Sequence, residues 1–254
     1  MKVGDYVSRN SYKNDTIFKI LNIKNNIVYL KGVDYRLYAD APMDDLKIVK
    51  KEDIKDDFKV DDVEFKEDRD EFFYLPGKVL HLDSDNDYLK RCMNYYKKNN
   101  VYAVGKRIDE KDLKGEIRQI LEEIRPDIVI ITGHDSFRKG ALKSDIKSYK
   151  NSLNFVNAVK EARRYEKSHD KLIIIAGACQ SDYEELIKAG ANFASSPKRI
   201  NIHALDPAII ATNLALTERN KTIDLLELLS KTRNGKDGMG GLISNGLMFV
   251  GYPR

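Results

Sequence analysis

Two residues of this chain, a cysteine and a histidine, each stand at the end of an apolar run. Cys179 lies in LIIIAGACQSDY, and His134 lies in IVIITGHDS. A thiol in such a position is either a small core residue or a nucleophile at the edge of a sheet. A neutral thiol, with a pKa of about 8.5, is a poor nucleophile until a neighbouring imidazole takes its proton. Acyl transfer through a thiolate–imidazolium pair is therefore the chemistry that these two residue types could perform.

Apolar segments alternate with helical patterns over the C-terminal part of the chain, as in 111–124 and 147–166. This alternation predicts an α/β fold with a doubly wound parallel sheet that helices cover on both faces. Ligands of such sheets bind beyond the carboxyl ends of the strands. Parallel strands are predicted at 78–82, 101–105, 127–132, 172–177 and 191–196, with a last strand or hairpin in 240–253.

The spacing of the two candidate residues fits this sheet. His134 follows the third predicted strand and Cys179 the fourth, 45 positions further on, which is the length of one strand–helix unit. Those strands are neighbours in the expected strand order, 2-1-3-4, so the two side chains could meet at one rim. A glycine also lies before each of them, and glycine permits a sharp turn and close approach of a substrate.

Carboxylates follow several of the same strands. Asp83 and Asp85 come after the first strand and could hold a basic side chain through charge-assisted hydrogen bonds. A solvated turn, or a helix cap at Asp85, is the alternative. Asp182 and Asp206 each precede a helical segment and are predicted to cap it.

Acyl transfer also requires donors for an oxyanion. The backbone N–H of Cys179 is one candidate, and Gly133 or the turn after it could supply the second. The stretch ANFASSPKRINIHALDP, with His203, forms either the far wall of a cleft or a connection in which the histidine is structural. Zinc-ligand spacing, a G-x-S-x-G elbow and a glycine-rich phosphate loop do not occur in the sequence, so no metal and no cofactor is expected.

The chain is organised in three parts. Residues 1–50 read as short strands and hairpins and predict a small SH3-like β-barrel, which could bind a peptide, bind RNA or act as a scaffold. A densely charged linker is expected at 51–72, and the α/β domain at 73–254. With 42% hydrophobic residues, two cysteines and no apolar leader, the composition predicts a cytoplasmic protein with reduced thiols and no membrane partner. A net charge of +4 is too mild to predict nucleic-acid binding.

Longer strings carry a family resemblance. GVDYRLYADAPMDDL, KVLHLDSDNDYLKRC, ITGHDS and GACQSDYEELIKAGANFASSPKRINIHALDP resemble the YabG family, sporulation-specific proteases of endospore-forming Firmicutes, over nearly the whole chain. A His after the third strand and a Cys after the fourth also resemble the caspase, clostripain and gingipain group of cysteine peptidases. The resemblance implies a caspase-like peptidase domain with His134 as general base and Cys179 as nucleophile.

The resemblance further implies cleavage after basic residues, mainly Arg, in spore coat and cortex-related proteins, together with self-processing. We therefore expect a protein of the mother cell of a sporulating bacterium, associated with the spore coat, that cuts itself after Arg or Lys in the linker. Carboxylates that could read the basic residue are Asp83, Asp85, Asp182 and Asp206. One departure stands out: the caspase-like group has Gly directly after the catalytic His, whereas here Gly133 precedes His134 and Asp135 follows it.

Two other functions remain open from the residues alone. The chain could be a non-catalytic module that binds RNA or a coat protein, with the α/β domain as a binding platform. It could also be a thiol amidase that acts on small amides. Reaction of Cys179 with iodoacetamide well below pH 8 would favour an activated thiol over a core residue.

Overall fold

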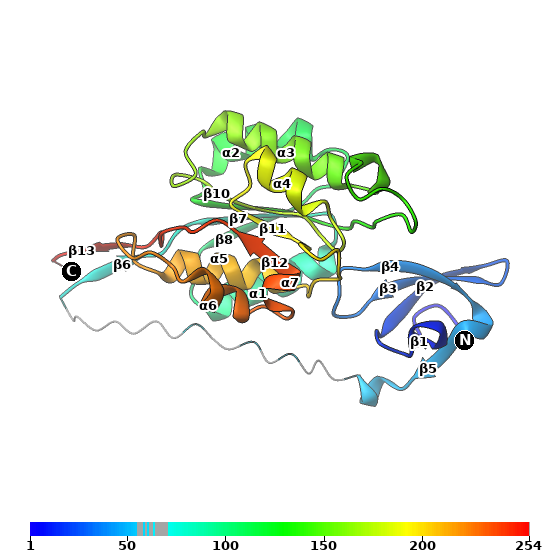
Figure 1. The fold of residues 1–254 in the computed structure, drawn as a ribbon. Coiled ribbons are helices and arrows are strands. Elements are labelled where there is room, and N and C mark those ends of the chain that lie inside the picture. Colours follow the sequence, from blue (N-terminus) through cyan, green and yellow to red (C-terminus); the bar gives the residue numbers. More distant parts are fainter. Residues whose placement is uncertain (55–57, 59, 61–62, 64–70, 254) are drawn as a thin grey trace. The chain divides into compact units, whose positions relative to one another are not determined.

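The structure, a computed structural model, describes residues 1–54, 58, 60, 63 and 71–253 and divides the chain into two compact units, Met1–Lys59 and Val60–Arg254 (Figure 1). Most of the predicted linker at 51–72, with four of its five Lys and Arg residues as expected processing sites, lies outside the described residues. Within the described ranges, no helix combines the length and the apolar character that crossing a bilayer requires.

The first unit is one antiparallel sheet of five strands: β1 (Tyr6–Arg9), β2 (Phe18–Lys24), β3 (Ile27–Gly32), β4 (Tyr38–Pro42) and β5 (Leu46–Val49). Its order is β4-β3-β2-β1-β5. Alternate residues such as Phe18, Ile20, Val28 and Leu30 point into one small core, as the period of a half-buried strand requires.

The predicted SH3-like barrel is not confirmed, because this sheet is not closed. A 3-10 turn, Met43–Asp45, connects β4 directly to β5, and β5 then pairs with β1 at the opposite edge. In the part of the chain that the structure describes, β4 pairs with β3 and makes no ladder with β5.

The second unit is built on a six-stranded sheet with the order β12-β11-β10-β9-β7-β8. Its parallel strands are β7 (Val79–Asp83), β8 (Ala103–Arg107), β9 (Ile128–Thr132), β10 (Ile173–Ala176) and β11 (Phe193–Ser195). The predicted parallel sheet and its strand order are confirmed. Strand β12 (Met239–Gly241) runs antiparallel to β11 at one edge.

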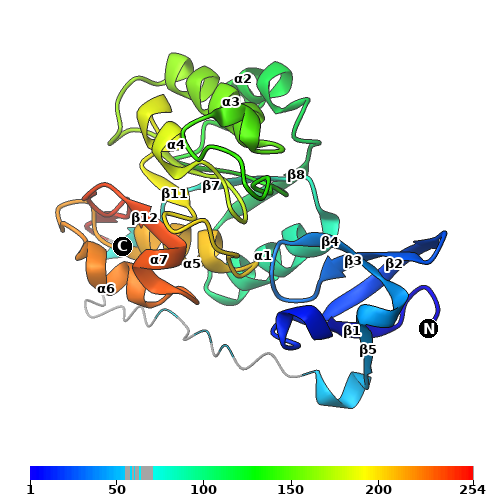
Figure 2. The same ribbon diagram turned by 45° about the vertical axis from the view of Figure 1, so that its right-hand side comes forward.

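Helices cover both faces of this sheet (Figures 1 and 2). On one face lie α2 (Leu113–Ile124), α3 (Ser152–Tyr165) and α4 (Tyr183–Ala189); on the other lie α1 (Asn86–Lys98), α5 (Asp206–Leu216), α6 (Leu225–Ser230) and α7 (Gly235–Gly238). Because both faces are covered, β7, β9 and β10 are buried along their whole length, which explains the continuous apolar runs 128–131 in β9 and Ile173–Ala176 in β10. The architecture is consistent with a caspase-like fold.

The C-terminal stretch differs from a simple hairpin. Strand β12 extends the main sheet, whereas β13 (Phe249–Gly251) pairs with β6 (Phe73–Leu75) in a separate two-stranded ribbon. The chain therefore returns at its end to the beginning of the second unit.

Candidate active site

The register of two central strands sets the positions of His134 and Cys179. Strands β9 and β10 run parallel with Ile131 opposite Ala176, and each candidate residue lies three positions beyond one of these partners. The hydroxyl of Thr132 donates to the carbonyl oxygen of Gly177 at 2.8 Å and joins the two strand ends. The turns that carry the two residues therefore leave the sheet side by side.

Cys179 is buried, with no exposed surface, and its sulfur lies against the segment after β11. The backbone N–H of Ile202 donates to Cys179 Sγ at 3.3 Å, and Sγ lies 3.8 Å from the carbonyl oxygen of Ile202. Gly177, with a φ of 103°, permits the tight exit from β10, where a Cβ would meet Leu186 at 2.8 Å. The stretch predicted as the far wall of a cleft thus packs on the thiol, while its His203 is buried and accepts the N–H of Leu205.

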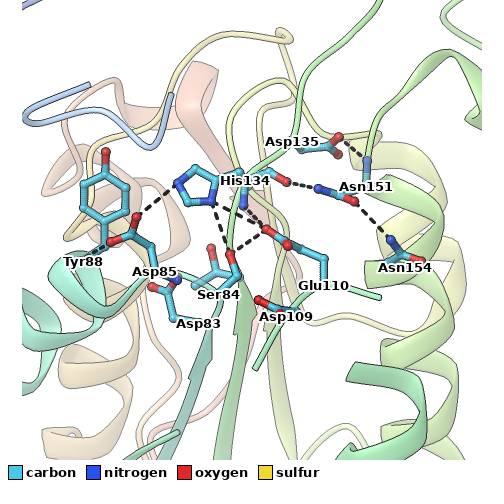
Figure 3. A network of polar contacts seen from close by, with 12 residues as sticks. Asp83, Ser84, Asp85, Tyr88, Asp109, Glu110, His134, Asp135, Asn151 and Asn154 are labelled. Atoms are coloured by element: carbon cyan, nitrogen blue, oxygen red, sulfur yellow. Dashed lines mark hydrogen bonds and ion pairs between the residues drawn. The ribbon is translucent and has the colours of Figure 1, made fainter. Parts of the chain in front are cut away.

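The His134 ring lies between two acidic groups (Figure 3). Its Nε2 is 3.6 Å from Asp85 Oδ2. Its Nδ1 is 3.3 Å from the hydroxyl of Ser84 and 3.6 Å from Glu110 Oε1. The His134 ring thus contacts Ser84, Asp85 and Glu110, and Cys179 Sγ contacts the backbone of Ile202.

Glu110 is held as a carboxylate. Burial opposes its ionisation, but hydrogen bonds from the His134 side chain, from Ser84 and from the backbone of His134 outweigh burial and lower the pKa of Glu110 to about 2. The hydroxyl of Ser84 donates to Oε1 at 2.6 Å, and the N–H of His134 donates to the same oxygen at 2.8 Å. The N–H of His134 is therefore committed to Glu110 and is not an oxyanion donor in this geometry.

The glycine before the histidine has a local cause in the same contacts. A Cβ at Gly133 would lie 2.5 Å from Glu110 Oε1 and 2.6 Å from Ser84 Oγ. Only a residue without a side chain lets this carboxylate and this hydroxyl come so close to the strand end. Gly133 thus makes room for the groups that contact His134.

The two acids after β7 occupy different environments. Asp83 is fully buried, accepts the N–H of Asp85 at 3.0 Å and lies 3.7 Å from His81 Nε2. Asp85 caps α1 through Oδ1, which accepts the N–H groups of Asp87 and Tyr88, and turns Oδ2 toward His134. The cap that was the alternative for Asp85 is therefore present, together with a contact to the histidine.

Asp182 and Asp206 make their contacts elsewhere. Asp182 caps α4 as predicted, and Arg199 Nη2 lies 3.4 Å from its Oδ1; burial raises the pKa of Asp182. A cavity of about 490 Å³ opens beside it. The cap predicted for Asp206 is wrong: this residue is the first of α5, its N-cap is Leu205, and its carboxylate accepts the backbone N–H groups of His203 and Arg233.

Three polar contacts of His134 were not predicted, those with Ser84, Asp85 and Glu110. Glu110 follows β8, the second parallel strand, which pairs with β7 at the edge of the sheet. The available signal was a carboxylate shortly after a parallel strand, the same signal that pointed to Asp83. In the described part of the chain, no group of three or more His, Cys, Asp or Glu residues is arranged to hold a metal ion.

The fold and these residues define an α/β protein with a thiol and an imidazole at the carboxyl ends of adjacent strands. The chain matches the family model described as YabG peptidase U57 over residues 2–65 and 55–253. It is also 39% identical to the sporulation-specific protease YabG of Bacillus subtilis (strain 168), over 99% of this chain and 98% of that protein. The chain therefore belongs to the YabG peptidase family, and the predicted family membership is confirmed.

Among solved structures, one similar chain is a mutant of the receiver domain of the histidine kinase CKI1 from Arabidopsis thaliana. The two chains are 18% identical, with a TM-score of 0.30, and the match covers 45% of this chain and 76% of the other.

Proposed function

We propose that this chain is a cysteine endopeptidase of sporulation that cleaves proteins after basic residues through His134 and Cys179. The observation that carries the proposal is the matched position of these two residues, each three positions beyond a register partner at the ends of β9 and β10. Membership of a peptidase family supplies the reaction class, hydrolysis of a peptide bond.

The proposed reaction has two halves. The thiolate of Cys179 attacks the scissile carbonyl carbon, and the carbonyl electron pair moves to oxygen. The tetrahedral intermediate collapses, the C–N bond breaks, and the imidazolium of His134 gives its proton to the leaving amine. Water then loses a proton to His134 and attacks the thioester, and the C–S bond breaks to regenerate the thiolate. Because Cys179 is buried, substrate entry requires the groups that cover it to move.

Carboxylates around His134 support its role. An imidazolium between Asp85 and Glu110 has a negative group near each ring nitrogen, at 3.6 Å in both cases. Acceptor oxygens at this range can hold the ring in one orientation for proton transfer. For the oxyanion, the backbone N–H of Cys179 and that of Gly133 are the proposed donors, since the N–H of His134 donates to Glu110.

We propose Asp83 and Asp85 as the carboxylates that bind the basic side chain of the substrate residue before the scissile bond. Both lie in the acidic surroundings of His134, with Glu110 and Asp109 on the neighbouring turn (Figure 3). Asp182 and Asp206 are weaker candidates. Asp182 lies beside the cavity but already faces Arg199, and both oxygens of Asp206 accept backbone N–H groups.

The proposed substrates are spore coat and cortex-associated proteins and the chain itself, in the mother cell and at the spore coat. What supports this part is the similarity to the 39% identical Bacillus subtilis protein, a sporulation-specific protease.

The test compares two cysteine variants on peptides that differ only in the residue before the scissile bond. Cys179→Ala should abolish cleavage, while Cys92→Ala, which removes the other buried thiol, should retain it. Arg peptides should be cleaved faster than matched neutral peptides. Full activity of Cys179→Ala would overturn the proposal.

A further inference from the structure

Asp135, the residue directly after His134, is buried and accepts four hydrogen bonds. Its Oδ1 accepts the backbone N–H of Ser136 at 2.9 Å and that of Asn151 at 2.7 Å. Its Oδ2 accepts the hydroxyl of Ser152 at 2.5 Å and that of Ser181 at 2.9 Å. Only 3% of the residue is exposed, so these donors take the place of water.

The two hydroxyls continue to the turn that carries Cys179. Ser181 Oγ accepts the N–H of Ala178 at 2.9 Å, and Ser152 Oγ accepts the N–H of Asp182 at 2.8 Å. Each serine hydroxyl donates its one proton to the carboxylate in a hydrogen bond. The lone pairs of the hydroxyl oxygen are then available to accept from a backbone N–H group. Asp135 is therefore connected, through the two serine hydroxyls, to the backbone N–H groups of Ala178 and Asp182. These residues lie one position before Cys179 and three positions after it.

The same carboxylate is tied to the turn of His134. Asn151, whose N–H donates to Asp135, also donates from Nδ2 to the carbonyl oxygen of His134 at 2.8 Å (Figure 3). Its own side chain is held by Asn154, which donates to Asn151 Oδ1 at 3.1 Å. The start of α3, the His134 turn and the Cys179 turn thus meet at one side chain.

We propose that Asp135 is a positioning residue that fixes the Cys179 turn against the His134 turn through Ser152 and Ser181. This inference rests on the proposed function, because positioning matters only if the two residues react together. It also gives a reason for the departure from the caspase-like pattern: an aspartate stands where that group has glycine, and it joins the two turns. An error of about 1 Å in such a site lowers a rate about a hundredfold.

An amide cannot replace the carboxylate. Asn has a single acceptor oxygen, so its NH₂ group would face either the two hydroxyls or the two backbone N–H groups, and two of the four hydrogen bonds are lost in either orientation. Asp135→Asn therefore keeps size and shape but removes two of these hydrogen bonds. Ser181→Ala and Ser152→Ala are milder changes, each of which removes one of the two connections, to Ala178 or to Asp182 respectively.

The first measurement is amide hydrogen exchange by NMR on the full chain. In Asp135→Asn, the amides of Ala178 and Asp182 should exchange about ten- to a hundredfold faster, because each loses a hydrogen bond that a charged group supports. Ser181→Ala should affect the amide of Ala178 and spare that of Asp182. The amide of Ile174, which donates to the Asn192 side chain in the core, should be unchanged in both variants. Unchanged exchange at Ala178 and Asp182 in Asp135→Asn would overturn the proposal.

The second measurement is peptide cleavage. Asp135→Asn should lower kcat about ten- to a hundredfold with KM within about twofold, since the thiol is displaced while substrate binding is kept. Faster exchange with wild-type kcat would mean a structural role only and would overturn positioning. Cleavage by Cys179→Ala at the wild-type rate would instead contradict the proposed function. It would also contradict the positioning role of Asp135, whatever the exchange data show. The two failures are thus distinguishable.

Discussion

Replacing Glu110 with Gln isolates the charge of the group that contacts His134. Gln keeps an oxygen that can accept from Ser84 and from the N–H of His134, and it loses the negative charge. Because the pKa of Glu110 is lowered to about 2, its carboxylate is ionised throughout the neutral range. Glu110→Gln should therefore lower both the free energy of unfolding and the rate of cleavage at pH 7.

The stability effect can be sized from the pKa. A shift from 4.5 to about 2 corresponds to about 3 kcal/mol at neutral pH if fully expressed. The side chain is 15% exposed, and solvent screening reduces the expected loss to about 1–2 kcal/mol. Since the folded pKa is depressed, this stabilisation is present above pH 4.5 and is lost as pH falls toward 2.

The assay is urea unfolding of wild type and Glu110→Gln between pH 7 and pH 3. The difference in unfolding free energy should be about 1–2 kcal/mol at pH 7 and should shrink below about pH 5. The control is Glu122→Gln, which removes an exposed acid paired with Arg118 and should cost less than about 0.5 kcal/mol. Cleavage by Glu110→Gln should fall about tenfold or more, since His134 loses a charged neighbour.

Two results would refute this reasoning. A difference that stays constant from pH 7 to pH 3 would show that the charge of Glu110 contributes nothing to folding. Wild-type cleavage by Glu110→Gln would show that its contact with His134 has no part in the reaction.

Three further predictions follow from the site. Gly133→Ala should lower the free energy of unfolding in urea by about 1–3 kcal/mol, because its Cβ would lie 2.5 Å from Glu110 Oε1. The control Gly115→Ala, which has open space in α2, should be neutral or stabilising. Equal effects of the two substitutions would contradict this prediction. Burial raises the pKa of Asp135, so wild type should lose stability relative to Asp135→Asn as pH rises above about 4. A difference in unfolding free energy that does not change with pH would contradict this prediction. Asp85→Asn should reduce kcat/KM for Arg peptides more than for neutral peptides; equal losses would remove its proposed role in specificity.

The parallel sheet was predictable because its central strands are buried on both faces. The predicted segments 127–132 and 172–177 contain the apolar runs 128–131 and 172–176, and the structure has strands there at Ile128–Thr132 and Ile173–Ala176. The predicted second strand, 101–105, begins two residues before the strand in the structure, Ala103–Arg107. Its edge position exposes alternate residues and blurs the pattern.

Closure of the N-terminal sheet was not predictable from local pattern. Hairpin signals fix neighbouring strands, but a barrel depends on whether β4 and β5 pair, which is decided by the turn at Met43–Asp45 and by the pairing of β5 with β1. Such long-range pairing leaves no periodic trace in the sequence.

The candidate site was predictable in its position and not in its contacts. Parallel strand ends meet at one rim, so the turns of His134 and Cys179 could be expected there from spacing alone. The position of Glu110 after a parallel strand was visible in the sequence, but the contacts of Glu110 and Asp135 were not, because a carboxylate in a turn has the same sequence signal whether water or buried side chains face it. Only the folded chain brings Ser84 and Ser181 to those acids.

The most direct test of the account is mass spectrometry of the fragments that the purified chain produces from itself. Wild type and Cys92→Ala should release fragments that end in Arg or Lys, and Cys179→Ala should remain intact under the same conditions. Identical fragments from Cys179→Ala would contradict the central claim that Cys179 is the nucleophile.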